Sequence, residues 1–326
     1  MTPSLQAFME GLIDYAGLFP PARLELDTAI RNYAKYKGED DAWMLGRFII
    51  PVGRLAELDA YARLFAEGRP FRFSVLGHAA LRMDVFEAAQ ATMADAREFE
   101  ICHNGRTVAD RFEIKLQPQY LDLSAMADLF AQFHDAFGEK LSGEVRAFFE
   151  APLMGERWEA GIEKTVRAIA DANSDVGDGT FGLKLRCGGV TADVFPDVEA
   201  VAFAILMCRD AEIPFKATAG LHHPVRHYAD EVEATMHGFL NVFGGAMLAR
   251  LHEFDSSTLA RMLADEHAQH FVFFDESFGW MEWGASANDI MDARSRFATS
   301  FGSCSFDEPR EDLVALGMVD AASSRV

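Results

Sequence analysis

The 326-residue chain lacks several features that would assign it to a particular class of protein. Its four cysteines lie far apart and include no C-x-x-C pair, which argues against a zinc ribbon. No run approaches the roughly 18 apolar residues of a membrane span, and residues 1–11 lack the basic start and apolar core of a signal peptide. These absences predict a cytoplasmic protein with reduced thiols.

Basic residues are scarce, with 30 Lys and Arg against 51 Asp and Glu and a net charge of −21. So acidic a chain is not expected to bind nucleic acid or an anionic membrane. The total charge does not describe a single pocket, so a basic substrate pocket remains compatible with it. No G-x-G-x-x-G sequence opens a helix after a first strand, which disfavours an open dinucleotide-binding sheet. We expect no cofactor.

What the chain does have is a strand–helix–strand unit over residues 180–223. Two apolar runs, F-G-L-K-L-R and I-P-F-K-A-T, each carry a lysine and lead into small residues. Between the two runs, apolar residues over Asp197–Ala211 recur at helical spacing. A helix in this position is expected when the two strands are parallel neighbours. Lys184 and Lys216 then lie at equivalent strand ends, and Arg186 shares a strand face with Lys184. Such a cluster of cations predicts an anion site or a lysine with a lowered pKa.

Strand-like and helix-like segments alternate along most of the chain. The predicted strands are Leu12–Phe19, Gly46–Val52, Phe71–Gly77, Arg111–Gln117, Arg146–Pro152, the runs ending near Arg186 and Thr218, and Thr299–Phe306. The predicted helices are Leu24–Tyr36, Leu55–Ala66, Leu81–Phe99, Leu123–Phe137, Glu156–Asn173 and Asp197–Ala211. Eight parallel strands predict a single-domain (β/α)8 barrel over residues 1–326, with an open doubly wound sheet as the alternative.

Residues 228–298 are too many for one crossover helix, so we interpret them as a helical insertion between strands seven and eight. Helices are predicted over Val232–His252, Ser257–Ala268 and Ala287–Phe297. Two roles fit such an insertion, a lid over the site or a contact in a homo-oligomer. A further strand at Phe271–Phe274, within an aromatic run expected to form core or interface, is the alternative and would shift the strand numbering.

The order of the short motifs resembles the deoxyribose-phosphate aldolase family of class I aldolases. I-D-Y-A-G-L-F is similar to that family's first strand, and F-F-E-A-P to its fifth, which ends in a glutamate. F-G-L-K-L-R-C-G-G resembles the sixth strand, whose lysine forms the Schiff base, and F-K-A-T-A-G-L-H-H the seventh, whose lysine assists proton transfer. F-G-S-C-S is similar to the eighth, G-T-S-S, which helps to hold the phosphate.

The resemblance implies an aldolase or lyase acting on a small carbonyl compound that carries a phosphate or a carboxylate. Lys184 would form the Schiff base, Lys216 would relay protons, and Glu150 or Asp14 would orient them. The family's fourth strand has an aspartate for proton transfer, and Lys115 stands at that place here. The expected substrate-binding residues are Arg186, Thr218, Gly220, His222, Gly302, Ser303 and Ser305.

Elementary chemistry supports a special environment for one lysine. A lysine attacks a carbonyl only as the neutral amine, whereas an ordinary lysine is almost wholly charged at pH 7. A second cation nearby and partial burial both lower a lysine pKa. We therefore expect Lys216 and Arg186 to lower the pKa of Lys184.

Other hypotheses fit the same barrel. Glu150, His222, His78 and either Asp275 or Glu276 would form a metal site in an isomerase or hydrolase, but no H-x-H or H-E-x-x-H spacing supports it. Lysines crowded at the same mouth also oppose a dication, so we predict no bound metal. Cys187 lacks a visible base and is interpreted as a small core residue. A barrel that only binds a small anion or a protein partner is the non-enzymatic hypothesis.

Overall fold

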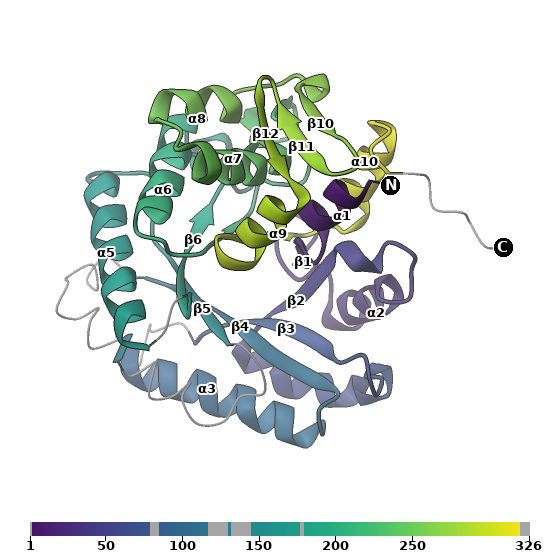
Figure 1. The fold of residues 1–326 in the computed structure, drawn as a ribbon. Helices are drawn as coiled ribbons and strands as arrows, with labels where there is room; N and C mark the ends of the chain where they lie inside the picture. The colour runs from purple at the N-terminus through teal and green to yellow at the C-terminus, as the bar shows by residue number, and fades with distance from the viewer. Residues whose placement is uncertain (1, 79–84, 117–129, 132–144, 177–178, 320–326) are drawn as a thin grey trace.

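The computed structural model is organised around a closed barrel of eight parallel strands (Figure 1). It describes residues 2–78, 85–116, 130–131, 145–176 and 179–319. Around the barrel the order is β1, β2, β3, β4, β5, β6, β7 and β13, which closes back on β1. Their bounds are β1 Ile13–Tyr15, β2 Leu45–Pro51, β3 Phe71–Leu76, β4 Thr107–Lys115, β5 Arg146–Glu150, β6 Phe181–Arg186, β7 Phe215–Thr218 and β13 Ala298–Ser303. The predicted (β/α)8 barrel is confirmed.

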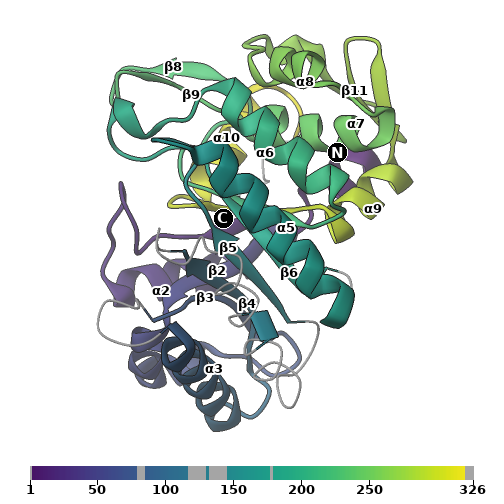
Figure 2. The same cartoon turned by 90° about the vertical axis from the view of Figure 1, so that its left-hand side faces the viewer.

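Helices surround this barrel, and α5 and α6 run side by side on its outside (Figure 2). The α-helices are α1 Pro3–Met9, α2 Leu26–Tyr36, α3 Val85–Cys102, α5 Trp158–Val176, α6 Val198–Asp210, α7 Gly245–His252, α8 Ser256–Leu263, α9 Ala287–Arg296 and α10 Asp307–Ala315. The segment predicted as a helix over Leu55–Ala66 is instead a 3-10 helix, Val52–Leu64. Most of the helix predicted over Leu123–Phe137 lies outside the described residues.

Both faces of the barrel strands β5 and β6 are covered, so most of their residues are apolar. Every residue of β5 is buried, and so is every residue of β6 except its last, Arg186. Helices cover the outer face of such strands, and side chains from the other strands fill the inner face. The charged residues of β5 and β6 stand out in this setting: Arg146, Glu150, Lys184 and Arg186.

Residues 219–297 connect β7 to β13 and contain strands as well as the predicted helices. β8 (His227–Ala229) and β9 (Ala234–Met236) form a hairpin, so the helix predicted from Val232 begins only with the π-helical turn Leu240–Gly244 and α7. β10 (Phe271–Phe273), β11 (Ser277–Trp280) and β12 (Trp283–Ser286) form a separate antiparallel sheet. The insertion predicted as helical therefore also contains short strands, because aromatic residues such as Phe278 and Trp280 favour strands. The alternative strand at Phe271–Phe274 exists outside the barrel, so the numbering of the barrel strands does not shift.

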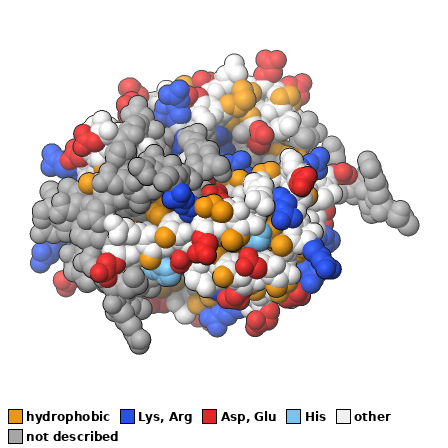
Figure 3. All heavy atoms as spheres, turned by 90° about the horizontal axis from the view of Figure 1, so that it is seen from below, with side chains coloured by type: hydrophobic (Ala, Val, Ile, Leu, Met, Phe, Trp, Pro, Cys, Tyr) orange, Lys and Arg blue, Asp and Glu red, His pale blue; other side chains and the backbone are white. Residues whose placement is uncertain are grey.

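The outer surface mixes charged and apolar side chains. In Figure 3 acidic, basic and apolar groups are interspersed over the part of the face that is not grey. Within the described ranges, no helix combines the length and the apolar character needed to cross a bilayer.

Close packing in the barrel makes a specific prediction for Gly182 on β6. A Cβ atom at this position would collide with the carbonyl oxygen of Pro214 and lie 2.8 Å from the ring of Phe148. We expect Gly182→Ala to lower the free energy of unfolding by about 1–3 kcal/mol, as overpacking of a core does. Urea unfolding measures this loss. Gly53→Ala is the control because nothing lies within 4 Å of the added Cβ, and equal stability of the two variants would contradict the prediction.

Candidate active site

Two lysines and a glutamate lie on neighbouring strands at the carboxyl end of the barrel. The pairing of β5 with β6 sets Glu150 opposite Lys184, and the pairing of β6 with β7 sets Lys184 opposite Lys216. Side chains opposite each other in a parallel pair point to the same face, so all three are brought together. All three are buried, and Lys216 is fully enclosed.

Glu113 on β4 lies between the two ammonium groups. Its Oε2 is 2.8 Å from Nζ of Lys184, and its Oε1 accepts a hydrogen bond from Nζ of Lys216. Ser74 on β3 donates to the same Oε1 at 2.6 Å. The lysines are therefore bridged through one carboxylate.

Further ion pairs, with alternating positive and negative groups, extend from Lys184 and from Lys216. Lys184 also pairs with Glu150 at 2.8 Å, and Glu150 pairs with Arg186 at 3.0 Å. Lys216 pairs with Asp14 at 3.0 Å. The resulting ion-pair chain comprises Arg186, Glu150, Lys184, Glu113, Lys216 and Asp14, and its three cations balance its three carboxylates.

Asp14 is held by groups outside the ion-pair chain. Its Oδ1 accepts from the backbone N–H of Arg47 at 2.7 Å, and its Oδ2 accepts from the hydroxyl of Ser300 at 2.8 Å. Gly46 precedes Arg47, and a Cβ there would collide with Oδ1 of Asp14. The absence of a side chain at Gly46 thus lets Asp14 reach the amide and orients its other oxygen toward Lys216.

The carboxylates reverse the pKa shift that the sequence predicted for Lys184. Burial lowers the pKa of this lysine, but Glu113 and Glu150 outweigh burial and raise the pKa above its ordinary value. The expectation that neighbouring cations lower it was wrong, because carboxylates lie closest to the amine. Burial raises the pKa of Glu113 and of Glu150, but the facing cations outweigh it and hold both below their usual range.

A cavity of about 200 Å³ opens above the ion-pair chain. Glu113, Lys184 and Arg186 line it, whereas Lys216 and Asp14 lie beneath them. Arg186 has 46% of its side chain exposed, against 7% for Lys184. A small molecule in this cavity would meet the amine of Lys184 and the guanidinium of Arg186.

The residues predicted to bind the substrate lie around this cavity, though not all line it. Thr218 and Gly302 do, together with Ala219. Gly220 has φ +71° and packs against the carbonyl of Cys187, where a Cβ would lie 2.9 Å from the oxygen, so glycine is required there. Cys187 itself is a buried core residue, as interpreted from the sequence. Ser303 is buried, and Ser305 accepts from the backbone N–H of Glu308 at 3.1 Å.

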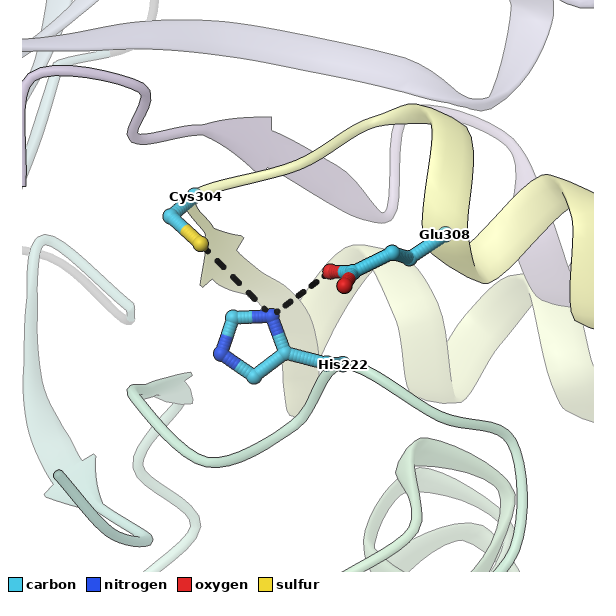
Figure 4. Close-up of side chains that lie close together, drawn as sticks. All are labelled: His222, Cys304 and Glu308. Atoms are coloured by element: carbon cyan, nitrogen blue, oxygen red, sulfur yellow. Dashed lines mark hydrogen bonds and ion pairs between the residues drawn. The ribbon is translucent and has the colours of Figure 1, made fainter. Parts of the chain in front are cut away.

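His222 lies at the rim of the cavity and faces two residues that the sequence did not single out for the site. Its Nδ1 is 3.8 Å from Sγ of Cys304 and 3.4 Å from Oε2 of Glu308, which lies in the first turn of α10 (Figure 4). Burial opposes a charge on the imidazole, but the contacts with Cys304 and Glu308 outweigh it and raise the pKa of His222 to about 9.

Lys115 does not join the ion-pair chain. It is exposed as the last residue of β4, two positions beyond Glu113. Both residues share one face of the strand, but only Glu113 lies deep enough to reach the two lysines. The sequence pattern predicted a catalytic role for the strand-end residue Lys115 and did not identify Glu113. The signal available was an acid on the inward face of β4, which only β5 separates from the lysine-bearing β6.

The metal site proposed as an alternative from the sequence is not assembled. Glu150 is engaged by Lys184 and Arg186, and His78 pairs with Asp95 at 2.9 Å. Asp275 and Glu276 lie between β10 and β11 in the separate sheet. These residues do not lie together, so the metal site predicted from this set of ligands was wrong.

A larger cavity of about 500 Å³ lies at the opposite, amino end of the strands. Its lining includes Arg146, Arg250 and Arg296 but none of the ion-pair chain. Active sites of barrels of this kind lie at the carboxyl end, where the loops after the strands meet. The smaller cavity is therefore the candidate active site.

Comparisons with known proteins agree with this fold. No protein-family model and no curated protein sequence matches the chain. A solved structure described as "QR15, an Aldolase" is similar, with a TM-score of 0.50 and 11% sequence identity. The match covers 96% of this chain and 99% of that one. Both chains have the fold of a (β/α)8 barrel. At this identity the likeness shows the fold alone.

The bridging carboxylate gives a prediction for stability. Glu113→Gln would leave two buried ammonium groups with one carboxylate fewer, so we expect the free energy of unfolding at pH 7 to fall by about 3–5 kcal/mol. Because the pKa of Glu113 is lowered on folding, its stabilisation is present above the unfolded value, about 4.3, and is lost as the pH falls below it.

Urea unfolding from about pH 7 down to about pH 3 tests both the loss of stability at neutral pH and its dependence on pH. The stability of the variant should depend less steeply on pH below about 5 than that of the wild type. Glu163→Gln, on the exposed face of α5, is the matched control and should behave as the wild type. A Glu113→Gln protein with wild-type stability and slope would contradict the bridge.

Proposed function

We propose that this protein is a lyase of the class I aldolase type, in which Lys184 forms a Schiff base with a small carbonyl compound. One observation carries the proposal: Lys184 lines the cavity while Glu113, 2.8 Å from its amine, connects it to the buried Lys216. An amine that meets a carbonyl compound, next to groups that can exchange its protons, is the arrangement that imine chemistry needs.

Formation of the imine begins with loss of a proton from the ammonium group. The proton passes from Nζ of Lys184 to the carboxylate of Glu113, and the neutral amine attacks the carbonyl carbon. One proton on the new C–N nitrogen moves to the former carbonyl oxygen, and Glu113 returns its own proton to that hydroxyl, which leaves as water. The balance is one ammonium and one carbonyl converted to one iminium and one water, so Glu113 and Glu150 still face a cation.

The iminium then accepts the electron pair of the neighbouring carbon–carbon bond as that bond breaks. A carboxylate removes the proton of the hydroxyl on the leaving fragment, which departs as an aldehyde, and the remaining enamine is protonated on carbon. Water hydrolyses the resulting iminium and restores Lys184. Lys216, which lies beneath the cavity and is itself paired with Asp14, holds Glu113 ionised between these steps.

The cavity limits the substrate class. A volume of about 200 Å³ is below the 300–1,000 Å³ usual for ligand pockets, so the substrate has few heavy atoms. Its phosphate or carboxylate would lie against Arg186 and the polar groups at Thr218 and Gly302, next to the buried Ser303. His222 and Ser305 lie at the edge of this region. Arg186 suits this role because about half of its side chain is exposed.

Borohydride trapping tests the Schiff base. The protein is incubated with small aldehydes and ketones, with and without a phosphate or carboxylate, and reduced, and its peptides are mapped by mass spectrometry. We expect a stoichiometric adduct on Lys184 with at least one compound, and loss of that adduct in Lys184→Met.

Lys115→Met is the matched control, because Lys115 is exposed and lies outside the ion-pair chain. It should keep the adduct. Absence of an adduct on Lys184 with every compound would leave a barrel that binds small anions without this chemistry. An adduct on Lys216 instead would reverse the assigned roles and contradict the proposal.

The pH dependence of trapping provides a separate prediction. Because Glu113 and Glu150 raise the pKa of Lys184, the neutral amine becomes abundant only as the pH rises, and trapping should accelerate from neutral to alkaline pH. Glu150→Gln removes one of these carboxylates and lowers that pKa. Trapping at pH 7 should then accelerate about tenfold for each pKa unit lost. The Glu163→Gln protein again serves as the control, and slower trapping in Glu150→Gln at every pH would show that Glu150 does not raise the pKa.

A further inference from the structure

Three potential ligand atoms approach one another at the rim of the cavity (Figure 4). Nδ1 of His222 comes from the loop after β7, Sγ of Cys304 follows β13, and Oε2 of Glu308 comes from α10. All lie within 4.8 Å of one another. Three separate elements thus bring a nitrogen, a sulfur and an oxygen to one point.

Hydrogen bonding alone does not account for this arrangement. In a nucleophile–imidazole–carboxylate triad the two ring nitrogens serve different partners. Here the thiol, the carboxylate and the hydroxyl of Ser303, 3.4 Å away, all face the same Nδ1. That nitrogen has at most one proton to donate, whereas Cys304 and Glu308 can both carry negative charge.

The spacing fits a tetrahedral metal ion. With zinc–nitrogen and zinc–oxygen distances of about 2.0–2.2 Å, two such ligand atoms lie about 3.4 Å apart, and a sulfur at about 2.3 Å lies about 3.6 Å from the nitrogen. The observed distances from Nδ1 are 3.4 Å to the oxygen and 3.8 Å to the sulfur. All three atoms lie within 4.8 Å of one another, so the thiol and the carboxylate would both close around the ion to complete a tetrahedral arrangement.

Charge does not oppose a cation at this position. The sequence suggested that crowded lysines would repel a dication, but each lysine is paired with carboxylates and the ion-pair chain sums to zero. A thiolate and a carboxylate supply two negative charges, and His222 and Cys304 line the cavity that also contains Lys184.

We propose that His222, Cys304 and Glu308 form a three-ligand site for a zinc-like divalent ion at the rim of the cavity. Three protein ligands leave a fourth position for water or for an oxygen of a small molecule, as in catalytic rather than structural zinc sites. The site does not depend on the Schiff base at Lys184. The two proposals can fail separately.

A second cluster, Asp265, His267 and His270, is less suited to a metal. Asp265 uses one oxygen for each histidine, and its Oδ2 also accepts from Nε1 of Trp280 at 2.8 Å. These bonds tie a turn to β11. His267 is mostly exposed, so His267→Gln removes this competing cluster with little effect on packing.

Cobalt titration of the full chain, freed of metal by a chelator, tests the proposal. One equivalent of Co²⁺ should produce a thiolate-to-cobalt charge-transfer band in the near ultraviolet, and Zn²⁺ should displace it. The band should vanish in Cys304→Ser. Glu308→Gln, a change at an exposed position, and His222→Gln should each weaken Co²⁺ binding more than about tenfold.

Cys102→Ser is the matched thiol control because Cys102 is an exposed cysteine elsewhere, and it should keep the band, as should His267→Gln. Alkylation of the wild type adds a measurement that needs no variant: Zn²⁺ should slow the labelling of Cys304 but not that of Cys102. A wild type without the band, a band that survives in folded Cys304→Ser, or equal labelling of Cys304 with and without Zn²⁺ would overturn the site.

Discussion

Two ammonium groups buried inside one barrel require carboxylates between them, because an unpaired buried charge costs several kcal/mol. Glu113 meets this requirement for Lys184 and Lys216 together. Asp14 and Glu150 then complete the neutralisation at the two ends. Much of the surrounding detail follows from this need, including the hydroxyls that donate to the carboxylates and the glycine that lets Asp14 accept a backbone amide.

The closed barrel is what makes such a chain of charges attainable. Its members come from β1, β4, β5, β6 and β7, and β13 lies between β7 and β1 and completes the circle. In an open sheet Asp14 would stand at a distance from Lys216, since β1 and β7 are not adjacent in the barrel order. Long side chains that point inward across a closed barrel can meet even when their strands are not neighbours. The site is thus a consequence of closure as well as of strand register.

The sequence predicted the barrel and the neighbouring lysines because both depend on local patterns. Apolar runs of strand length, separated by helical spacing, specify the strands, and equivalent positions on β6 and β7 specify Lys184 and Lys216. It did not predict Glu113, because Glu113 and Lys115 share a strand face and only the depth within the barrel distinguishes them. Cys304 and Glu308 were missed for a different reason. Their meeting with His222 depends on loops that join distant parts of the chain.

The ion-pair chain, which has no net charge, and the proposed metal site at His222, Cys304 and Glu308 meet at one cavity. An amine surrounded by two carboxylates keeps its proton, which opposes attack on a carbonyl. A divalent ion at His222, Cys304 and Glu308 would be neutralised by the thiolate and the carboxylate, so it would bind without adding net positive charge beside Lys184. The two proposed sites therefore need not compete for charge. Lys184 and the rim residues His222 and Cys304 line the same cavity, so one small molecule can meet both sites without movement of the barrel.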